Sequence, residues 1–378
     1  MKYNYLFYFS NEIGSVFDSQ VVALLNSLAE KRYFKNIYLF LGVRNNLQKK
    51  ECLNRNINEG IEIIYFSSFP NYPLFNILQR RKLSKVLNGV SINFEKVVFH
   101  TRGELLSWHL SKILGKRYYN NILPDIRGAT SEEVSEYFVI NGFKKILKLY
   151  NYKAALRNLN KFKKLTVVSN SLSEYLISNY QIDRKVITVI PCLAGKNFYF
   201  DQTIKKQTRK KLNLTKNEKL LVFTNGGEAT WQNNNLLRDL TDKGFKILNL
   251  SKKEIIHKNV INKFVKYSEV PSFLNAADAA FIFRDASVVN KVASPVKFSE
   301  YICCGLPVIA NNNVDMINEF IKTHAYGAIV ENIHSINLNL ITQLNQIERS
   351  EIANIGSNKF GVEIISKMYQ ECYNGEAV

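Results

Sequence analysis

The chain has 378 residues, enough for two domains of ordinary size. Hydrophobic residues make up 46% of it, so a core can form without disulfides or structural metals, and its 24 Phe, 20 Tyr, 17 Gly and 7 Pro exclude collagen-like and disordered classes. Its 51 basic and 32 acidic residues give a formal net charge of +19. This charge attracts an anionic partner, which could be nucleic acid, an acidic lipid surface or a phosphate-bearing small molecule.

Short apolar segments alternate with amphipathic segments of helical length along most of the chain. Because these segments are apolar on both faces, they predict parallel strands covered by helices, which is an α/β architecture. A helix is expected at 21–31. The predicted strands are 3–9, 37–41, 61–66, 96–100, 165–169, 186–190, 220–224, 246–250, 279–283 and 307–310, and a further strand is expected to end in 122–128.

A polar, basic stretch at 205–211 lies between two strand-rich halves of similar size. It places the domain boundary near residue 195. Two doubly wound domains imply a cleft between them, and such folds bind ligands beyond the carboxyl ends of their strands.

The segment 143–164 contains eight basic residues and no acidic residue. On a helical projection, Phe143 and Tyr150 share one face, opposite Lys144, Lys145 and Lys148. This pattern fits a surface helix with a solvated basic face or a contact with an anionic membrane surface. A nucleic-acid stripe ranks third, because no known binding module accompanies the segment. No stretch reaches the roughly 20 apolar residues of a membrane-spanning helix.

A short helix leading into a buried strand is predicted at 294–310. Ser294 suits the N-cap, Pro295 and Val296 would begin the helix, and Gly305 suits the position just after its end. The N-terminus of such a helix attracts anions, so a phosphate is expected there.

Two charged residues of this helix extend the prediction. Lys297 lies in the first turn, where a bound phosphate would relieve the unfavourable position of a cation against the helix dipole. Glu300, one turn deeper, could accept hydrogen bonds from a ribose diol. The alternative is an ordinary capped helix with a surface Lys–Glu pair.

The run 297–310, KFSEYICCGLPVIA, resembles the donor-binding signature of retaining glycosyltransferases with the GT-B fold, particularly glycosyltransferase family 4. The resemblance covers most of 165–310. It implies two Rossmann-like domains that face a cleft: an acceptor-binding domain at 1–195 and a nucleotide-sugar-binding domain at 196–359. It also implies that a last helix at 360–378 crosses back to complete the first domain.

The chain departs from this family at two places. Where the family commonly has a second glutamate eight residues before Glu300, this chain has Val292, so that sugar contact is either missing or made by Asn290 or Lys291. The first C-terminal loop carries Gly226 and Gly227, which are expected to contact the donor, but no basic residue follows them. Arg284 would then supply the second positive charge, the alternative being a surface salt bridge with Asp285.

Polar residues at two strand ends are the candidates for the acceptor side. Asp125 could orient the acceptor hydroxyl or accept its proton, and Arg127 could hold Asp125 or an acceptor anion. The alternative is a structural Asp–Arg pair that closes the turn. Arg102, beside His100, is a weaker candidate for substrate contact, and Gly14 could allow close approach of a ligand.

No metal or other cofactor is expected. The chain has no D-x-D pair, its five histidines lack ligand spacing, and its five cysteines lack C-x-x-C spacing, which also argues against a disulfide framework. Catalysis would therefore rest on Lys297, Arg284 and helix N–H groups, which would stabilise the leaving diphosphate, together with Asp125.

The sequence and the resemblance together predict a retaining glycosyltransferase of hexosyltransferase type, using a UDP- or GDP-sugar. The acceptor would be a glycan or a lipid-linked hydroxyl, as in bacterial capsule or lipopolysaccharide assembly, and nucleic acid is not an expected partner. The expected location is the cytoplasm, and the protein could also attach peripherally to the inner face of the cell membrane. The alternatives are a nucleotide-sugar epimerase of the same fold and, less favoured, a non-enzymatic nucleic-acid-binding protein.

Overall fold

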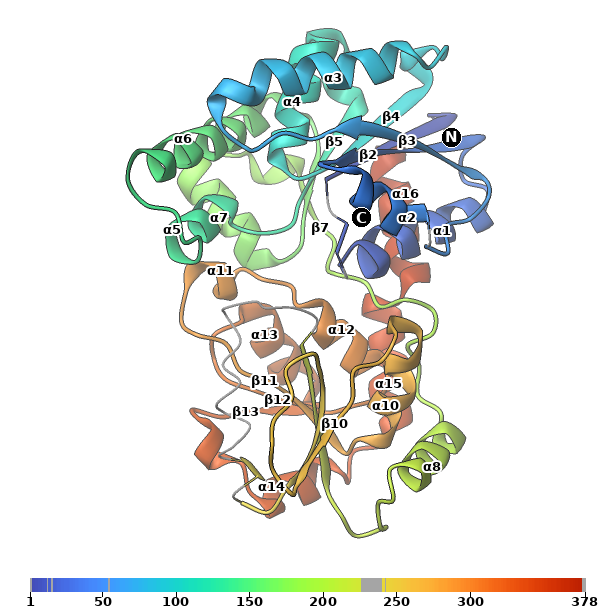
Figure 1. Ribbon diagram of the computed structural model, residues 1–378, viewed down its shortest axis with the longest axis vertical. Helices are drawn as coiled ribbons and strands as arrows, with labels where there is room; N and C mark the ends of the chain where they lie inside the picture. The colour runs from blue at the N-terminus through green and yellow to red at the C-terminus, as the bar shows by residue number, and fades with distance from the viewer. Residues whose placement is uncertain are drawn as a thin grey trace. The chain divides into compact units, whose positions relative to one another are not determined.

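The computed structural model describes residues 2–375 except Glu12, Ser15, Asn54, residues 226–239 and Asp242. The chain forms two compact units (Figure 1). The first contains Met1–Pro191 and Ile365–Val378, and the second contains Cys192–Ile364. The chain therefore enters the second unit once and returns to the first through its last helix.

The first unit is built on a seven-stranded parallel sheet with the order β3-β2-β1-β4-β5-β6-β7. Its strands are β1 Tyr5–Ser10, β2 Asn36–Val43, β3 Ile61–Ser67, β4 Val97–Arg102, β5 Ile122–Ile126, β6 Leu165–Val167 and β7 Ile187–Val189. Its helices are α1 Ala23–Glu30, α2 Asn46–Leu53, α3 Asn76–Asn88, α4 Glu104–Leu114, α5 Thr130–Glu136, α6 Gly142–Asn158, α7 Asn170–Tyr180 and α16 Val362–Asn374. Short turns of other helix types are η1 Phe17–Val22, η2 Pro73–Phe75, η3 Phe94–Lys96, η4 Lys116–Asn121, η5 Leu159–Lys161 and η6 Arg184–Val186.

Aromatic side chains fill the centre of this sheet. All six residues of β4 are buried, as are the last five of β1. The rings of Phe9 and Phe40 stack at 4.5 Å, and Phe7 meets Phe99 edge-on at 5.6 Å. Burial on both faces explains why residues 6–9 of β1 and residues 97–99 of β4 are continuously apolar rather than alternating.

The second unit has a six-stranded parallel sheet with the order β10-β9-β8-β11-β12-β13. Its strands are β8 Leu220–Asn225, β9 Lys246–Ser251, β10 Val260–Asn262, β11 Ala279–Ile282, β12 Val308–Ala310 and β13 Gly327–Ile329. Its helices are α8 Gln202–Lys211, α10 Val270–Ala276, α11 Val288–Lys291, α12 Val296–Cys303, α13 Asp315–His324, α14 Leu338–Leu344 and α15 Arg349–Phe360, with short turns η7 Tyr267–Glu269 and η8 Ile333–Ser335.

The two faces of the second sheet pack into separate apolar layers. Leu220 and Val222 of β8 lie in a layer with Phe298 of α12, whereas Leu221 lies in the opposite layer with Ile341 of α14. This alternation along β8 follows from the two-residue period of a strand. It fixes α12 against one face of the sheet.

The α/β architecture with two doubly wound sheets, predicted from the sequence, is confirmed. Two strands were not expected, β10 and β13, and both are three-residue edge strands that are only half-buried. The helix expected at 21–31 is α1, which begins at Ala23 and continues from the π-helical turn η1. None of the described helices is long and apolar enough to cross a membrane.

The orientation of α6 differs from the simple amphipathic expectation. Its buried face lies in its second half and contains Tyr152, Ala155 and Leu156. Phe143 and Tyr150, on the face that the projection placed opposite the lysines, are 72% and 62% exposed. The helix therefore exposes an apolar face, and on the predicted basic face Lys144 is also exposed while Lys145 and Lys148 are half-buried.

Candidate functional site

The N-terminus of α12 lies at the carboxyl edge of the second sheet, and its cap differs from the prediction. The N-cap is Pro295, one residue later than expected, and no side chain caps the helix. The hydroxyl of Ser294 instead accepts a hydrogen bond from the backbone N–H of Cys192 at 3.0 Å. Ser299 donates to the carbonyl of Cys192 at 2.7 Å, so these two serines fix α12 to the start of the second unit. Val296 is the first helical residue and is half-buried.

Two cationic side chains converge beside this helix. Lys297 lies in the first turn of α12, and Arg284 follows β11 by two residues. Both line one small pocket together with Thr224 and Tyr301. Desolvation, followed by the charge of Arg284, lowers the pKa of Lys297 from 10.5 to about 7, although the charge of Glu300 opposes the shift. The predicted pair of positive groups is thus brought together by the fold.

Glu300 is buried, with 6% of its surface exposed, on the next turn of α12. Its Oε1 accepts a hydrogen bond from the hydroxyl of Tyr267 at 2.9 Å. Burial raises the pKa of Glu300 to about 7, while the hydrogen bond from Tyr267 and the charge of Lys297 act in the opposite direction. A carboxyl group poised near neutrality beside a cation is typical of a ligand site rather than of a solvated Lys–Glu pair.

The backbone of β8 connects these groups. The ammonium of Lys297 donates to the carbonyl of Thr224, at the carboxyl end of β8. The hydroxyl of Tyr301 lies 2.7 Å from Oγ1 of Thr224 and accepts from its backbone N–H at 3.2 Å. Tyr301 therefore ties the middle of α12 to the strand end at which the pocket opens.

The far end of α12 is held by a buried arginine. Gly305 has a φ of +70°, as predicted for the residue after the helix, and an added Cβ would lie 2.4 Å from the carbonyl oxygen of Arg349. The guanidinium of Arg349 donates to the carbonyls of Cys304 and Gly305 at 2.8 and 3.0 Å. These bonds satisfy acceptors at the C-terminus of the helix and so fix its direction.

Asn290, the predicted replacement for the missing glutamate, has a local structural partner. Its side-chain amide donates to the carbonyl of Asp285 at 3.0 Å, and its side chain is buried. It closes the turn that carries Arg284. Val292 is also buried, at the end of α11. Gly226 and Gly227 lie outside the described residues.

The first unit has its own cluster of charged groups around Asp125, at the end of β5. Asp125 is 1% exposed. Its Oδ1 accepts hydrogen bonds from the hydroxyls of Thr166 at 2.9 Å and Tyr369 at 3.1 Å. Arg127 lies 3.5 Å from the same oxygen, and its other terminal nitrogen donates to Gln20 at 3.2 Å. Tyr369 belongs to α16, so the cluster joins the last helix to the sheet.

The second oxygen of Asp125 faces two further basic groups. Oδ2 lies 3.5 Å from Nε2 of His100 and 3.8 Å from Nη1 of Arg102. Although burial alone would raise the pKa of Asp125, the charge of Arg127, the bond with His100 and the charges of both His100 and Arg102 hold it well below its usual range. Burial lowers the pKa of His100, whose Nδ1 lies 2.7 Å from the hydroxyl of Tyr373. The predicted residues Asp125, Arg127 and Arg102 therefore form one buried network.

Gly14 lines a cavity of about 390 Å³ in the first unit. The cavity lies beyond the carboxyl ends of β1, β2 and β3, and Arg44 and Glu51 contribute its charged groups. No described protein atom lies within 4 Å of a Cβ built on Gly14. Gly42 is the more constrained residue, because its Cβ would lie 2.0 Å from Oδ1 of Asn11.

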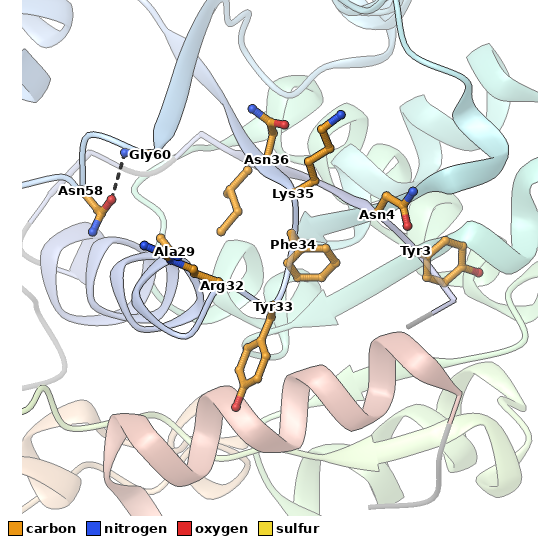
Figure 2. Close-up of a pocket in the computed structure, with 11 residues that line it drawn as sticks. Tyr3, Asn4, Ala29, Arg32, Tyr33, Phe34, Lys35, Asn36, Asn58 and Gly60 are labelled. Atoms are coloured by element: carbon orange, nitrogen blue, oxygen red, sulfur yellow. Dashed lines mark hydrogen bonds between the residues drawn. The ribbon is translucent and has the colours of Figure 1, made fainter.

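A wider cavity, of about 700 Å³, lies at the opposite edge of this sheet (Figure 2). It is lined mainly by the residues between α1 and β2 and by the turn before β3, where Asn58 accepts from the N–H of Gly60 at 2.9 Å. Ligands of doubly wound folds bind at the carboxyl ends of strands. The smaller cavity beside Gly14 is therefore the better candidate for an acceptor site.

Metal ligands do not gather in the described part of the chain, where no group of three or more His, Cys, Asp and Glu could hold an ion. None of the five cysteines forms a disulfide, and all five are buried. The described residues thus offer cationic side chains, rather than metal ligands, to an anion.

Sequence reasoning missed several partners of the site. Tyr267 and Thr224 lie 33 and 73 residues from the α12 side chains that they contact, and no local pattern marks them. Tyr301 lies within the recognised run 297–310 but was given no role. Asn311, whose side-chain oxygen accepts from the N–H of Arg284 at 3.1 Å, follows β12 directly and could have been noted as a strand-end polar residue.

Comparisons with known proteins show which solved structures share this fold. No family model and no curated protein matches the sequence. Among solved structures, a glycosyltransferase from Rickettsia africae is 15% identical, with a TM-score of 0.66 and 99% coverage of both chains. Anabaena HepE in complex with UDP and glucose is 13% identical, with a TM-score of 0.69 and coverage of 98% of this chain and 99% of that one.

A third structure, WaaG, is described as a glycosyltransferase involved in lipopolysaccharide biosynthesis. It is 10% identical, with a TM-score of 0.69 and coverage of 98% of this chain and all of the other. At these identities the likeness establishes the fold alone. The fold is that of GT-B glycosyltransferases, as the resemblance of run 297–310 predicted.

Proposed function

We propose that this protein is a glycosyltransferase that transfers a sugar from a nucleotide-sugar donor to a hydroxyl acceptor. The observation that carries the proposal is the convergence of Lys297 and Arg284 beside the N-terminus of α12, at the carboxyl edge of the second sheet. The charge of Arg284 lowers the pKa of Lys297, so an anion that binds beside the two side chains would favour the protonated ammonium. The fold and the bound UDP and glucose of HepE, a structure of the same fold, indicate the donor class.

The donor's diphosphate is proposed to bind at Lys297, Arg284 and the start of α12, where Pro295 and Val296 bring the helix N-terminus to the pocket. The helix dipole and the two cations all favour negative charge. As the sugar–phosphate bond breaks, negative charge grows on the diphosphate, and preorganised cations stabilise that charge. This supports a metal-independent reaction, and retention of anomeric configuration is inferred from the resemblance alone.

Glu300 is proposed to hold the donor's ribose. A carboxylate with one oxygen bonded to Tyr267 has its second oxygen available in a fixed orientation for a diol. Ionisation of Glu300 would strengthen those hydrogen bonds, since charged acceptors bind more tightly than neutral ones. Protonated Lys297 favours that ionisation, so diphosphate and ribose binding support one another.

The acceptor is proposed to bind to the first unit, beside Gly14 and Gly42. Asp125 is better suited to positioning than to general-base catalysis, because it is buried and several cations hold its pKa low. In this role it would hold Arg127 and Arg102 in place, and either arginine could meet an anionic acceptor. A glycan or lipid-linked acceptor of a bacterial surface polysaccharide is the proposed substrate class, by analogy with WaaG.

A thermal-shift screen with UDP-, GDP-, ADP- and CMP-sugars tests donor binding. One nucleotide class should raise the melting temperature, and Lys297→Met and Glu300→Gln should each abolish that rise. Lys322→Met, an exposed lysine of α13, serves as the matched control and should keep it. A wild-type protein that no nucleotide sugar stabilises would contradict the proposed function.

The epimerase alternative makes a different prediction for the same donor. Incubation of the stabilising donor without acceptor, followed by chromatography of the sugar, should return it unchanged. Conversion to an epimer under these conditions would replace the transferase proposal by the epimerase.

A further inference from the structure

The exposed face of α6 combines apolar and basic side chains in sequence. Phe143, Ile146 and Tyr150 are 72%, 62% and 62% exposed in its first turns. Lys153 and Arg157, at the next positions of the same stripe, are also exposed. The spacing of 3, 4, 3 and 4 residues keeps all five on one side of the helix.

A second segment in contact with α6 also exposes large apolar side chains. Leu74 of η2 is 81% exposed and Ile77 of α3 is 61% exposed. The adjacent Asn76 donates to Asn151 of α6 at 2.7 Å, which holds the start of α3 beside α6 (Figure 1). Val139, in the turn before α6, is 96% exposed. We name these six residues, Leu74, Ile77, Val139, Phe143, Ile146 and Tyr150, the apolar patch.

The charge around the apolar patch is strongly positive. Residues 63–94 contain four basic residues and no acidic one, and residues 143–164 contain eight basic residues and no acidic one. Glu62 and Glu95 directly flank the first range, and Glu132, Glu133 and Glu136 of α5 precede the second. Large exposed apolar side chains mark an interaction site, and the surrounding cations require a partner that is apolar and anionic together.

We propose that the apolar patch inserts into the headgroup region of an anionic lipid leaflet, with Lys153 and Arg157 on the lipid phosphates. A helix with aromatic and aliphatic residues beside basic ones is suited to the plane of a membrane interface. The proposal does not depend on sugar transfer. It also identifies which lysines matter: Lys145 and Lys148 lie on the half-buried side of α6, and the ammonium of Lys148 lies 4.4 Å from the ring centre of Phe138.

Flotation of the full chain with vesicles tests the proposal. Vesicles of phosphatidylcholine mixed with phosphatidylglycerol should carry the protein upward, and phosphatidylcholine alone should not. The combined variant Phe143→Ser, Ile146→Ser and Tyr150→Ser keeps the charge unchanged and should weaken binding at least tenfold. Lys153→Gln with Arg157→Gln should weaken it roughly thirtyfold at low salt.

The matched control places serine at two exposed apolar residues of the second unit, Ile256 and Phe264, which are 98% and 64% exposed. Ile256→Ser with Phe264→Ser should float like the wild-type protein. Failure of the wild type to float, equal binding to both kinds of vesicle, or an unaffected α6 serine variant would each overturn the proposal. If instead that variant converts a wild-type dimer to monomers in sedimentation without any flotation, the patch binds a second copy and not lipid.

A fluorescent label at position 139 tests directly whether the apolar patch inserts into the membrane. All five native cysteines are buried, so Val139→Cys offers a selective site for an environment-sensitive dye. Its emission should shift to the blue with anionic vesicles, whereas the dye on Ile256→Cys should not respond. Equal responses at the two positions would contradict insertion at the patch.

Discussion

Donor binding should draw a proton from solution, and Lys297 should be its destination. In the free protein, desolvation and the charge of Arg284 lower the pKa of Lys297 to about 7. A bound diphosphate adds negative charge beside the ammonium, which returns the pKa toward its ordinary value of 10.5. Between these two pKa values the free protein lacks a proton that the complex holds.

The size of this uptake follows from the two pKa values. Near pH 8, about a tenth of the free Lys297 is protonated, compared with nearly all of it in the complex, so about 0.9 proton is taken up. Glu300, with a pKa of about 7, is then about nine-tenths ionised and releases about 0.1 proton when it ionises fully. The net uptake expected is about 0.8 proton for each donor bound.

Titration calorimetry in buffers of different ionisation enthalpy measures this number. UDP-glucose is the suitable ligand, because UDP itself has a terminal phosphate that titrates near pH 6 and would add its own proton. Lys297→Met should bind about 30-fold more weakly and release a fraction of a proton rather than take one up, because without the charge of Lys297 the pKa of Glu300 lies above about 7 and more of its carboxyl is protonated before binding. Lys322→Met should behave like the wild-type protein.

An uptake below about 0.3 proton in the wild type would refute the reasoning, since Lys297 would then be protonated before the donor arrives. An undiminished uptake in Lys297→Met would refute it in another way, because the proton would belong to a different group.

Two further variants test the partners of the site. Tyr267→Phe removes a hydrogen bond that lowers the pKa of Glu300, so that pKa should rise above about 7. Donor affinity, measured by calorimetry, should then fall more at neutral pH than near pH 9. An equal loss of affinity at both pH values would contradict this role of Tyr267. Asp125→Asn leaves Arg127 and its neighbours without their counter-charge and should destabilise the protein by about 3–5 kcal/mol, measured by thermal or denaturant unfolding. Since the native pKa of Asp125 is depressed, the wild-type advantage should persist above pH 3.8 and shrink only at more acidic pH; a loss already at pH 6 would point to another group.

The strands at the centre of each sheet were predictable because burial on both faces leaves a direct mark on the sequence. The first three residues of β4 and all three of β12 are apolar, and both strands were expected within one or two residues of their bounds. The edge strands β10 and β13 carry no such mark, since each is three residues long and half-buried. Their pairing depends on the neighbouring strand rather than on their own composition.

Local sequence patterns mispredicted the role of a side chain where its partner lies far away in the sequence. Ser294 has the chemistry of an N-cap, but its hydroxyl bonds Cys192, 102 residues away, and Pro295 takes the cap position. On α6, a helical projection identifies the apolar stripe but not which stripe the rest of the protein covers. Tyr152 and Leu156 occupy the covered side, so Phe143 is left outside.

In the candidate site, too, residues within one short run were predictable and their distant partners were not. Lys297 and Glu300 were predictable because they lie in one short run, 297–310, that resembles a known donor-binding signature. Tyr267 and Thr224, which set the hydrogen bonding of those two residues, come from other strands and turns, and only the folded sheet brings them there.

The return of the chain to its first unit has a consequence for biosynthesis. Tyr369 and Tyr373 of α16 contact the buried Asp125 and His100, and both tyrosines are made only after the whole second unit. During translation, therefore, the charged interior of the first unit cannot be sealed until the second unit has been made. The central unit, made of one continuous segment, can fold earlier, so the order of folding need not follow the order of synthesis.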